Sequence, residues 1–164
     1  MNYFAYGSNM SLARLSARIP SVRRIGVGSL AGYTLVFHKA GESDGSAKCD
    51  AFFTDDPSHE VLGVVYRIDP DDKNRLDIIE GVGYGYENRC VTVRLDDGSA
   101  VSAWVYCATA INASLLPYDW YREHVLRGAL ENGLPDHYVS CIRAVEARSD
   151  PDRERASREL SIYA

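Results

Sequence analysis

Strand signals fill most of the first two thirds of the chain, and helix signals fill the last third. Apolar and polar residues alternate at Tyr33–Phe37, as they do in a half-buried strand. The Asp97-Gly98 pair separates two β-rich runs, Arg89–Leu95 and Ala100–Ala108, and predicts a hairpin. Because strands and helices are segregated, without internal repeats or a linker, we expect a single α+β domain over residues 1–164.

Helix signals mark four segments. One helix is predicted from Asp69 to Gly81, because proline and acidic residues suit its first turn and glycine suits its end. In this helix we expect Leu76 and Ile79, with Ile78 as a further candidate, to form the buried side. The charged tail after Ser149 is expected to fray. The other three helices are predicted at Ser11–Ile19, Pro117–Glu131 and about 135–147.

The charge balance limits the partners of this chain. With 18 Lys and Arg against 23 Asp and Glu, the net charge is -5, which disfavours nucleic acid as a partner. No apolar run approaches the roughly 18 residues that span a bilayer, and the chain opens with a strand-like segment instead of a secretory signal. We therefore expect a soluble cytoplasmic protein with no membrane partner, and leave open the choice between a monomer and a homodimer.

The segment Tyr3–Met10 joins the opening strand to the first helix through Gly7-Ser8-Asn9. Such a junction directs several backbone N–H groups toward one point, which suits a carboxylate or a developing oxyanion. The alternative is an ordinary strand-to-helix turn in which Ser or Asn caps the helix. The pattern alone favours the ordinary turn.

Glu80 stands in the last turn of its predicted helix, where the negative end of the helix dipole disfavours a carboxylate. Asp77 lies three residues earlier on the same face and adds like charge. A glutamate at a position that is unfavourable for its charge is a candidate for general acid/base catalysis. The alternative is an exposed glutamate at a helix end, without a role.

Two further patterns argue against a nucleotide site and a metal site. The spacing of Gly26, Gly28 and Gly32 does not match a dinucleotide-binding loop. Neither the histidines nor the cysteines stand at a metal-binding spacing. We therefore expect neither a bound nucleotide nor a metal ion. The residues concerned are His38, His59, His124, His137, Cys49, Cys90, Cys107 and Cys141.

Three segments together resemble a known family, the γ-glutamylcyclotransferases. Tyr3–Met10 is similar to the substrate loop of the family, and Leu76–Val82 is similar to the segment that carries its catalytic glutamate. Gly128–Pro135, with Tyr121 before it, is similar to the late helix of the enzymes that act on γ-glutamyl amino acids. The likeness extends from about residue 3 to residue 146.

The resemblance implies a mixed sheet that closes into a small barrel with flanking helices. It also implies a cofactor-free reaction on a small γ-glutamyl substrate, in which the substrate's own α-amine attacks its γ-carbonyl. The products are 5-oxoproline and a free amine, and Glu80 is the implied catalytic residue. The implied substrate-binding residues are Tyr3, Phe4, Ala5, Tyr6, Gly7, Ser8, Asn9, Tyr86 and Tyr121.

Two positions bear on the leaving group. Asn9 stands where the glutathione-specific relatives carry leucine, which disfavours a dedicated glutathione-degrading role. In the family members that are most similar in the Gly128–Pro135 segment, a tyrosine stands seven residues after the catalytic glutamate. Here that position, counted from Glu80, is Glu87, and the tyrosine is Tyr86. This departure affects the expected shape of the leaving-group pocket and leaves the expected catalysis unchanged.

Two other functions stay open at this level. One is a cyclotransferase of a biosynthetic pathway, which removes a γ-glutamyl protecting group from a larger product. The other is a non-catalytic module that binds an acidic or amino-acid ligand, since a fold does not determine a function. The catalytic interpretation requires that Glu80 and the Gly7–Asn9 turn face each other across one cavity.

Overall fold

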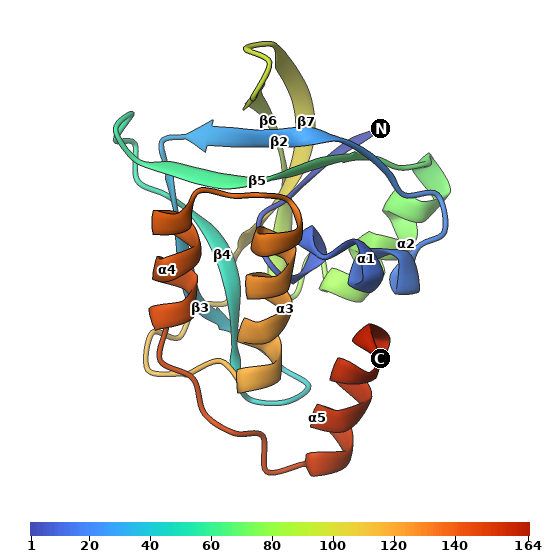
Figure 1. Cartoon of the computed structure of the whole chain (residues 1–164), viewed down its shortest axis with the longest axis vertical. Helices are drawn as coiled ribbons and strands as arrows, with labels where there is room; N and C mark the ends of the chain where they lie inside the picture. The colour runs from blue at the N-terminus through green and yellow to red at the C-terminus, as the bar shows by residue number, and fades with distance from the viewer.

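A closed five-stranded barrel forms the centre of the computed structural model, which describes residues 1–164 (Figure 1). The order around the barrel is β1–β5–β2–β6–β7, and a parallel pairing of Tyr3 with Trp104 closes it. This barrel with flanking helices confirms the α+β class and the architecture that the resemblance implied. The barrel strands are β1 (Asn2–Ala5), β2 (Arg23–Ala31), β5 (Glu60–Arg67), β6 (Tyr86–Leu95) and β7 (Ala100–Ala108).

A second, two-stranded sheet lies outside the barrel and was not expected as a separate unit. It pairs β3 (Tyr33–Ala40) with β4 (Ala47–Phe53). No helix combines the length and the hydropathy that crossing a bilayer requires. The helices are α1 (Leu12–Arg18), α2 (Pro70–Glu80), α3 (Asp119–Glu131), α4 (Asp136–Ala144) and α5 (Arg153–Leu160), with short 3₁₀ turns η1 (Ser8–Met10) and η2 (Ser161–Tyr163).

The predicted boundaries agree with the local chemistry of the chain. The Ser11 hydroxyl accepts a hydrogen bond from the Arg14 backbone N–H and so caps α1. At the end of α2, Gly81 adopts the left-handed conformation at φ 72° that glycine favours. The β6–β7 hairpin forms with Gly98 at φ 84°, as the Asp-Gly pair predicted.

The prediction for the buried side of α2 is wrong for two of its three residues. Leu76 is fully buried, but Ile79 is 45 % exposed and Ile78 is 80 % exposed. Lys73 takes the place of an apolar residue, because its ammonium lies 5.5 Å from the Trp104 ring and 5.0 Å from the Tyr106 ring. The buried face of α2 is therefore partly polar.

The tail after Ser149 does not fray but forms α5. Asp152 caps this helix by accepting a hydrogen bond from the Arg155 backbone N–H. Asp150, just before the cap, accepts hydrogen bonds from both the Arg155 guanidinium and the Trp120 indole. The contacts with Arg155 are local, and the contact with Trp120 joins residues 30 positions apart. Together they order the segment after Ser149, which its composition alone predicted to fray.

At Gly128, the backbone of helix α3 lies close to the backbone of the turn that follows β1. A Cβ atom at Gly128 would lie 2.6 Å from the Met10 Cβ and 2.6 Å from the Ser11 backbone nitrogen. The Met10 carbonyl also accepts hydrogen bonds from Tyr66 at 2.7 Å and Asn132 at 3.1 Å. The turn that follows β1 is therefore held in place by α3.

Replacing Gly128 with alanine tests this close approach. Alanine ordinarily stabilises a helix interior relative to glycine, by about 1 kcal/mol. At Gly128 we expect the opposite, a loss of about 1 to 3 kcal/mol in the free energy of unfolding, because the new methyl group overlaps Met10 and Ser11. Urea denaturation measures the change.

Gly26→Ala is the matched control, since a Cβ there would meet only Leu95, at 4.0 Å. We expect that variant to unfold close to the wild-type midpoint. If Gly128→Ala were as stable as wild type, the packing of α3 against the turn would not be as tight as the structure has it.

Candidate active site

Glu80 and the Gly7–Asn9 turn are in direct contact, although more than 70 residues separate them in the sequence. Glu80 is the last residue of α2, and its Oε1 accepts hydrogen bonds from Asn9 Nδ2 at 2.8 Å and Arg18 Nη1 at 2.6 Å. Arg18 Nη1 also donates to Asn9 Oδ1 at 3.0 Å. The three side chains form a closed set of polar contacts that fixes the carboxylate against the turn.

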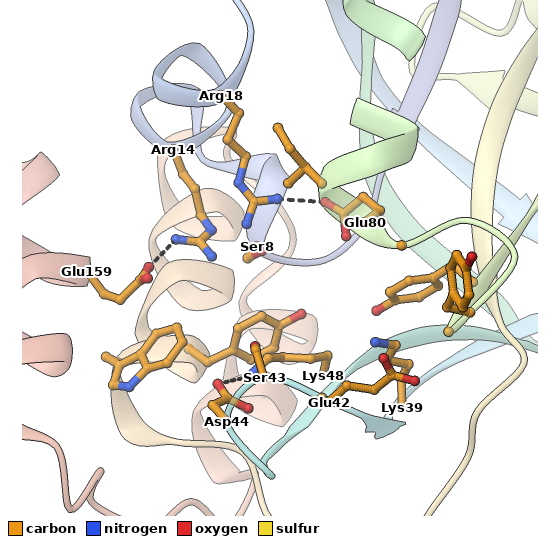
Figure 2. A pocket seen from close by; sticks show the side chains of 18 of the residues that line it. Ser8, Arg14, Arg18, Lys39, Glu42, Ser43, Asp44, Lys48, Glu80 and Glu159 are labelled. Carbon is orange, nitrogen blue, oxygen red and sulfur yellow. Dashed lines mark hydrogen bonds and ion pairs between the residues drawn. The ribbon is translucent and has the colours of Figure 1, made fainter. Parts of the chain in front are cut away.

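A cavity of about 380 Å³ opens beside this contact (Figure 2). A much smaller recess of about 20 Å³ continues from it toward the barrel. The cavity and the recess share four lining residues: Ser8, Glu80, Tyr86 and Tyr121. The recess is lined in addition by Tyr3, Tyr6, Gly7, Asn9, Cys49 and Tyr106.

Two of the nine implied substrate-binding residues lie elsewhere. Phe4 and Ala5 are completely buried, and neither lines the cavity or the recess. Gly63 of β5 packs directly against them, since a Cβ there would lie 2.3 Å from the Ala5 carbonyl oxygen. Phe4 and Ala5 thus pack the barrel, while the other seven residues gather at the cavity and its recess.

Backbone N–H groups without a partner point to where an anion fits. The N–H groups of Gly7, Ser8 and Asn9 donate to no atom of the chain, because these residues begin the 3₁₀ turn η1. Ser8 and Asn9 are nevertheless buried, at 7 % and 4 % exposure. Buried donors of this kind stabilise a carboxylate or an oxyanion that accepts hydrogen bonds from them.

Two tyrosine hydroxyl groups hold the backbone of Cys49 in β4 from opposite sides. The Tyr121 hydroxyl accepts from the Cys49 N–H at 3.0 Å, and the Tyr86 hydroxyl donates to the Cys49 carbonyl at 2.5 Å. Burial raises the pKa of both hydroxyls well above the usual range of tyrosine, so both stay protonated at neutral pH. Tyr121 therefore retains its own proton as a donor.

Asp77 is ionised but pairs with Lys73 of α2, so its charge acts on Glu80 less than the sequence suggested. It accepts hydrogen bonds from Lys73, from Asn88 at 3.2 Å and from the Tyr106 hydroxyl at 2.7 Å. Burial opposes ionisation of this carboxyl, but the three hydrogen bonds outweigh it and lower the pKa of Asp77. The Asp77 carboxylate is thus held by Lys73 of α2 and by Asn88 and Tyr106 of the barrel. Glu80 is the acidic residue that faces the Gly7–Asn9 turn.

Comparison with known proteins agrees with this geometry. A sequence model of the AIG2-like family matches residues 60–142. The γ-glutamylcyclotransferase of Homo sapiens is 34 % identical over 150 residues, which cover 88 % of this chain and 78 % of the human protein. The chain belongs to the γ-glutamylcyclotransferase family. The resemblance seen in the sequence is therefore confirmed.

Solved structures extend the comparison of this γ-glutamylcyclotransferase to the whole chain. A γ-glutamyl cyclotransferase structure aligns with a TM-score of 0.82 at 28 % identity, over 96 % of this chain and 98 % of that one. A yeast γ-glutamyl cyclotransferase specific to glutathione aligns with a TM-score of 0.62 at 13 % identity, over 87 % of this chain and 93 % of that one. The second comparison shows a shared fold.

Sequence reasoning missed the cationic side chains of this cyclotransferase site. Arg14 and Arg18 both line the cavity, and Arg18 orients Glu80. Their spacing of four residues in the helix after the Gly7–Asn9 turn places them on one face, and this signal was available in the sequence. Arg155 and Glu159 also line the cavity, but they come from the tail that was expected to fray.

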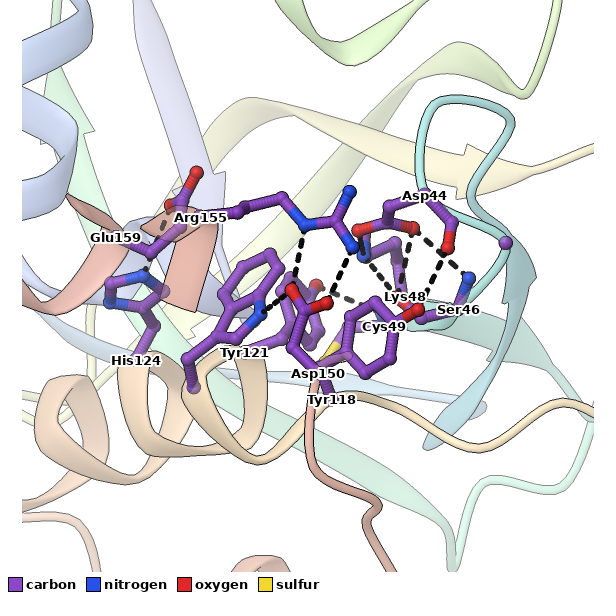
Figure 3. A network of polar contacts seen from close by, with 12 residues as sticks. Asp44, Ser46, Lys48, Cys49, Tyr118, Tyr121, His124, Asp150, Arg155 and Glu159 are labelled. Atoms are coloured by element: carbon purple, nitrogen blue, oxygen red, sulfur yellow. Dashed lines mark hydrogen bonds and ion pairs between the residues drawn. The ribbon is translucent and has the colours of Figure 1, made fainter. Parts of the chain in front are cut away.

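Helix α5 forms one wall of the site although none of its residues is buried (Figure 3). Polar contacts attach it at both ends. Arg155 donates to both oxygens of Asp150 at 2.6 Å, and Glu159 pairs with Arg14 at 2.7 Å. Arg14 also lies 2.9 Å from the buried ring nitrogen Nε2 of His124. Ion pairs therefore attach this wall, together with the partly buried Ala156 and Leu160, which pack against the core.

Replacing Glu159 with glutamine tests how α5 is held. Contacts with His124 and Arg14, opposed by burial, lower the pKa of Glu159 from 4.5 to about 2. A lowered folded-state pKa gives stability that is complete above 4.5 and is lost as the pH falls through about 2. At pH 7 we expect the variant to lose about 1 kcal/mol in the free energy of unfolding, since the carboxylate is partly exposed.

Denaturant titrations of wild type and Glu159→Gln should therefore differ at neutral pH and converge in acid. Glu154→Gln is the matched control, because Glu154 is exposed on the same helix and has no ion-pair partner. A difference that persisted unchanged below pH 2 would show that the ionised carboxylate is not what holds α5.

Proposed function

We propose that this chain releases 5-oxoproline from γ-glutamyl compounds through attack of the substrate's α-amine on its own γ-carbonyl, with Glu80 as the general acid/base. The contact of Glu80 with the Gly7–Asn9 turn at the edge of one cavity is the observation that carries the proposal. The family relationship supports the reaction. The expectations of a cytoplasmic location and of no nucleic-acid partner stay predictions.

The two oxygens of Glu80 support a division of roles. Oε1 is held by Asn9 and Arg18, whereas Oε2 has no hydrogen-bond partner within the chain. Arg18 donates a charge-assisted hydrogen bond to this carboxylate, and a carboxylate attracts the substrate's α-ammonium group. Oε2 is then the atom that accepts the proton from this ammonium group.

The proposed reaction needs no nucleophile from the protein. Loss of one proton to Glu80 frees the α-amine, whose nitrogen forms a bond to the γ-carbon while the carbonyl oxygen becomes an oxyanion. The N–H groups of the Gly7–Asn9 turn stabilise this oxyanion. Glu80 returns this proton to the leaving nitrogen as the oxyanion collapses and the bond to that nitrogen breaks. The ring nitrogen then gives its second proton to Glu80, which passes it to the released amine. The products are 5-oxoproline and the free amine.

Orientation of the substrate is as important in this scheme as proton transfer. Ring closure joins two ends of one molecule, and holding them in reactive geometry can contribute about 7 kcal/mol or more to lowering the barrier. The recess around Tyr3, Tyr6 and Gly7 is narrow, and Tyr121 at its edge keeps a proton that it can donate to a ligand. These residues suit the folded conformation that the reaction requires.

Glu80→Gln tests the proton-transfer role. Glutamine keeps an oxygen that can accept from Arg18 and Asn9, so we expect a folded protein that still binds a γ-glutamyl ligand. Its turnover should fall at least about a hundredfold, because the amide cannot carry the proton. Release of 5-oxoproline measures turnover, and calorimetry measures binding.

Glu87→Gln is the control, since Glu87 carries the same charge, pairs with Arg89 and does not line the cavity. It should keep wild-type turnover. Near-normal turnover of Glu80→Gln would remove Glu80 from its role. Tight binding by the wild type without any 5-oxoproline would favour the alternative of a non-catalytic binding module.

Tyr121→Phe tests substrate anchoring. Loss of the hydroxyl removes a donor to the ligand and should raise KM up to about tenfold, with a smaller effect on kcat. It also leaves the Cys49 N–H without a partner, so the free energy of unfolding should fall by about 1 kcal/mol or more. Steady-state kinetics and urea denaturation separate the two effects.

Tyr138→Phe provides the comparison, because the Tyr138 hydroxyl bonds to the Leu62 backbone and lies outside the cavity. It should lose stability without a change in KM. If both variants had the same KM as wild type, Tyr121 would be a residue of the core alone.

A further inference from the structure

The cavity is lined by more cations than the proposed reaction uses, and most of them are already neutralised. Four of the five pair with a carboxylate of the chain at 2.6 to 2.7 Å. These pairs are Arg14 with Glu159, Arg18 with Glu80, Lys48 with Asp44 and Arg155 with Asp150. A substrate carboxylate that bound to one of these four cations would share it with a carboxylate of the chain.

Lys39 of β3 is the exception. It is only 8 % exposed, yet its ammonium group makes no hydrogen bond or ion pair within the chain. Burial lowers its pKa, while the negative charges of Glu80, Glu42 and Asp44 act in the opposite direction without touching it. An ammonium group that lines the cavity without a carboxylate partner can pair with a carboxylate that a ligand brings.

Neighbouring residues fix the position of this ammonium group. Its nitrogen lies 4.9 Å from the centre of the Tyr86 ring. A Cβ atom at Gly85 would lie 2.7 Å from the same nitrogen, so the absence of a side chain at Gly85 makes room for it. Figure 2 shows Lys39 on the side of the cavity that faces Glu80.

We propose that Lys39 binds the carboxylate of the leaving group and so makes the enzyme prefer γ-glutamyl amino acids over γ-glutamyl amines without a carboxylate. This inference rests on the proposed function. In an amino acid, two bonds of about 1.5 Å separate the leaving nitrogen from the carboxylate carbon. The cation that binds this carboxylate must therefore lie near the acid that protonates the nitrogen, and Lys39 faces Glu80 across the cavity.

The charges of the substrate match this assignment. A γ-glutamyl amino acid carries two carboxylates, and its γ-carbonyl develops a third negative centre during the reaction. The Gly7–Asn9 turn offers neutral N–H donors on the glutamyl side. Lys39 is the one cavity cation that has no carboxylate partner in the chain. Glu42, at the same rim, is exposed and does not pair with it.

The test compares two substrates that differ only in the charge of the leaving group, γ-glutamyl-alanine and γ-glutamyl-alaninamide. We expect wild type to prefer the free carboxylate at least about tenfold in kcat/KM, as a charge-assisted hydrogen bond implies. Lys39→Met should reduce this ratio to near one by slowing the carboxylate substrate alone. Lys39→Arg, which keeps the charge, should retain most of the preference.

Lys48→Met is the matched control, because Lys48 lines the same cavity and Asp44 neutralises it. It should retain the wild-type ratio. Equal losses on both substrates in Lys39→Met would overturn the inference, since Lys39 would then bind the glutamyl part of the substrate. A wild-type preference ratio near one would also overturn it. If wild type released 5-oxoproline from no γ-glutamyl substrate at all, the proposed function would fail and this inference with it.

Discussion

The contact between Arg18, Glu80 and Asn9 is the interaction on which the rest of the site depends. It joins the end of α1, the end of α2 and the turn after β1 through hydrogen bonds of 2.6 to 3.0 Å. The helix dipole is unfavourable for a carboxylate at the C-terminal end of a helix, and the hydrogen bond from the Arg18 guanidinium group offsets this and fixes the orientation of the carboxylate. Without this cation, the glutamate would have no fixed position relative to the turn.

The barrel and α3 supply the rigidity that this contact requires. Strand β1 is enclosed between β5 and β7, so the turn that follows it leaves the barrel at a defined place. Close packing at Gly128 and the hydrogen bonds to the Met10 carbonyl then hold the turn from the other side. Catalytic groups placed at the ends of such elements are positioned more accurately than groups on long loops.

The sequence predicted much of the fold and the centre of the site, because these depend on local patterns. Gly81, the Asp97-Gly98 hairpin and the Ser11 cap each follow from the chemistry of a few neighbouring residues. Burial of Lys73 and the ordering of the tail depend on partners far away in the chain, such as Trp104 for Lys73 and Trp120 for Asp150. No local pattern contains that information. Nor does a local pattern show that the other four cavity cations pair with carboxylates while Lys39 does not.

Helix α5 has a practical consequence at the very end of the chain. Its residues reach the cavity through Arg155 and Glu159, and only a short 3₁₀ turn separates it from the last residue, Ala164. Tyr163 in that turn contacts His124 and Ser11, close to the start of α1. A group attached after Tyr163 would lie next to the contacts of Tyr163 with His124 and Ser11, and so beside the start of α1.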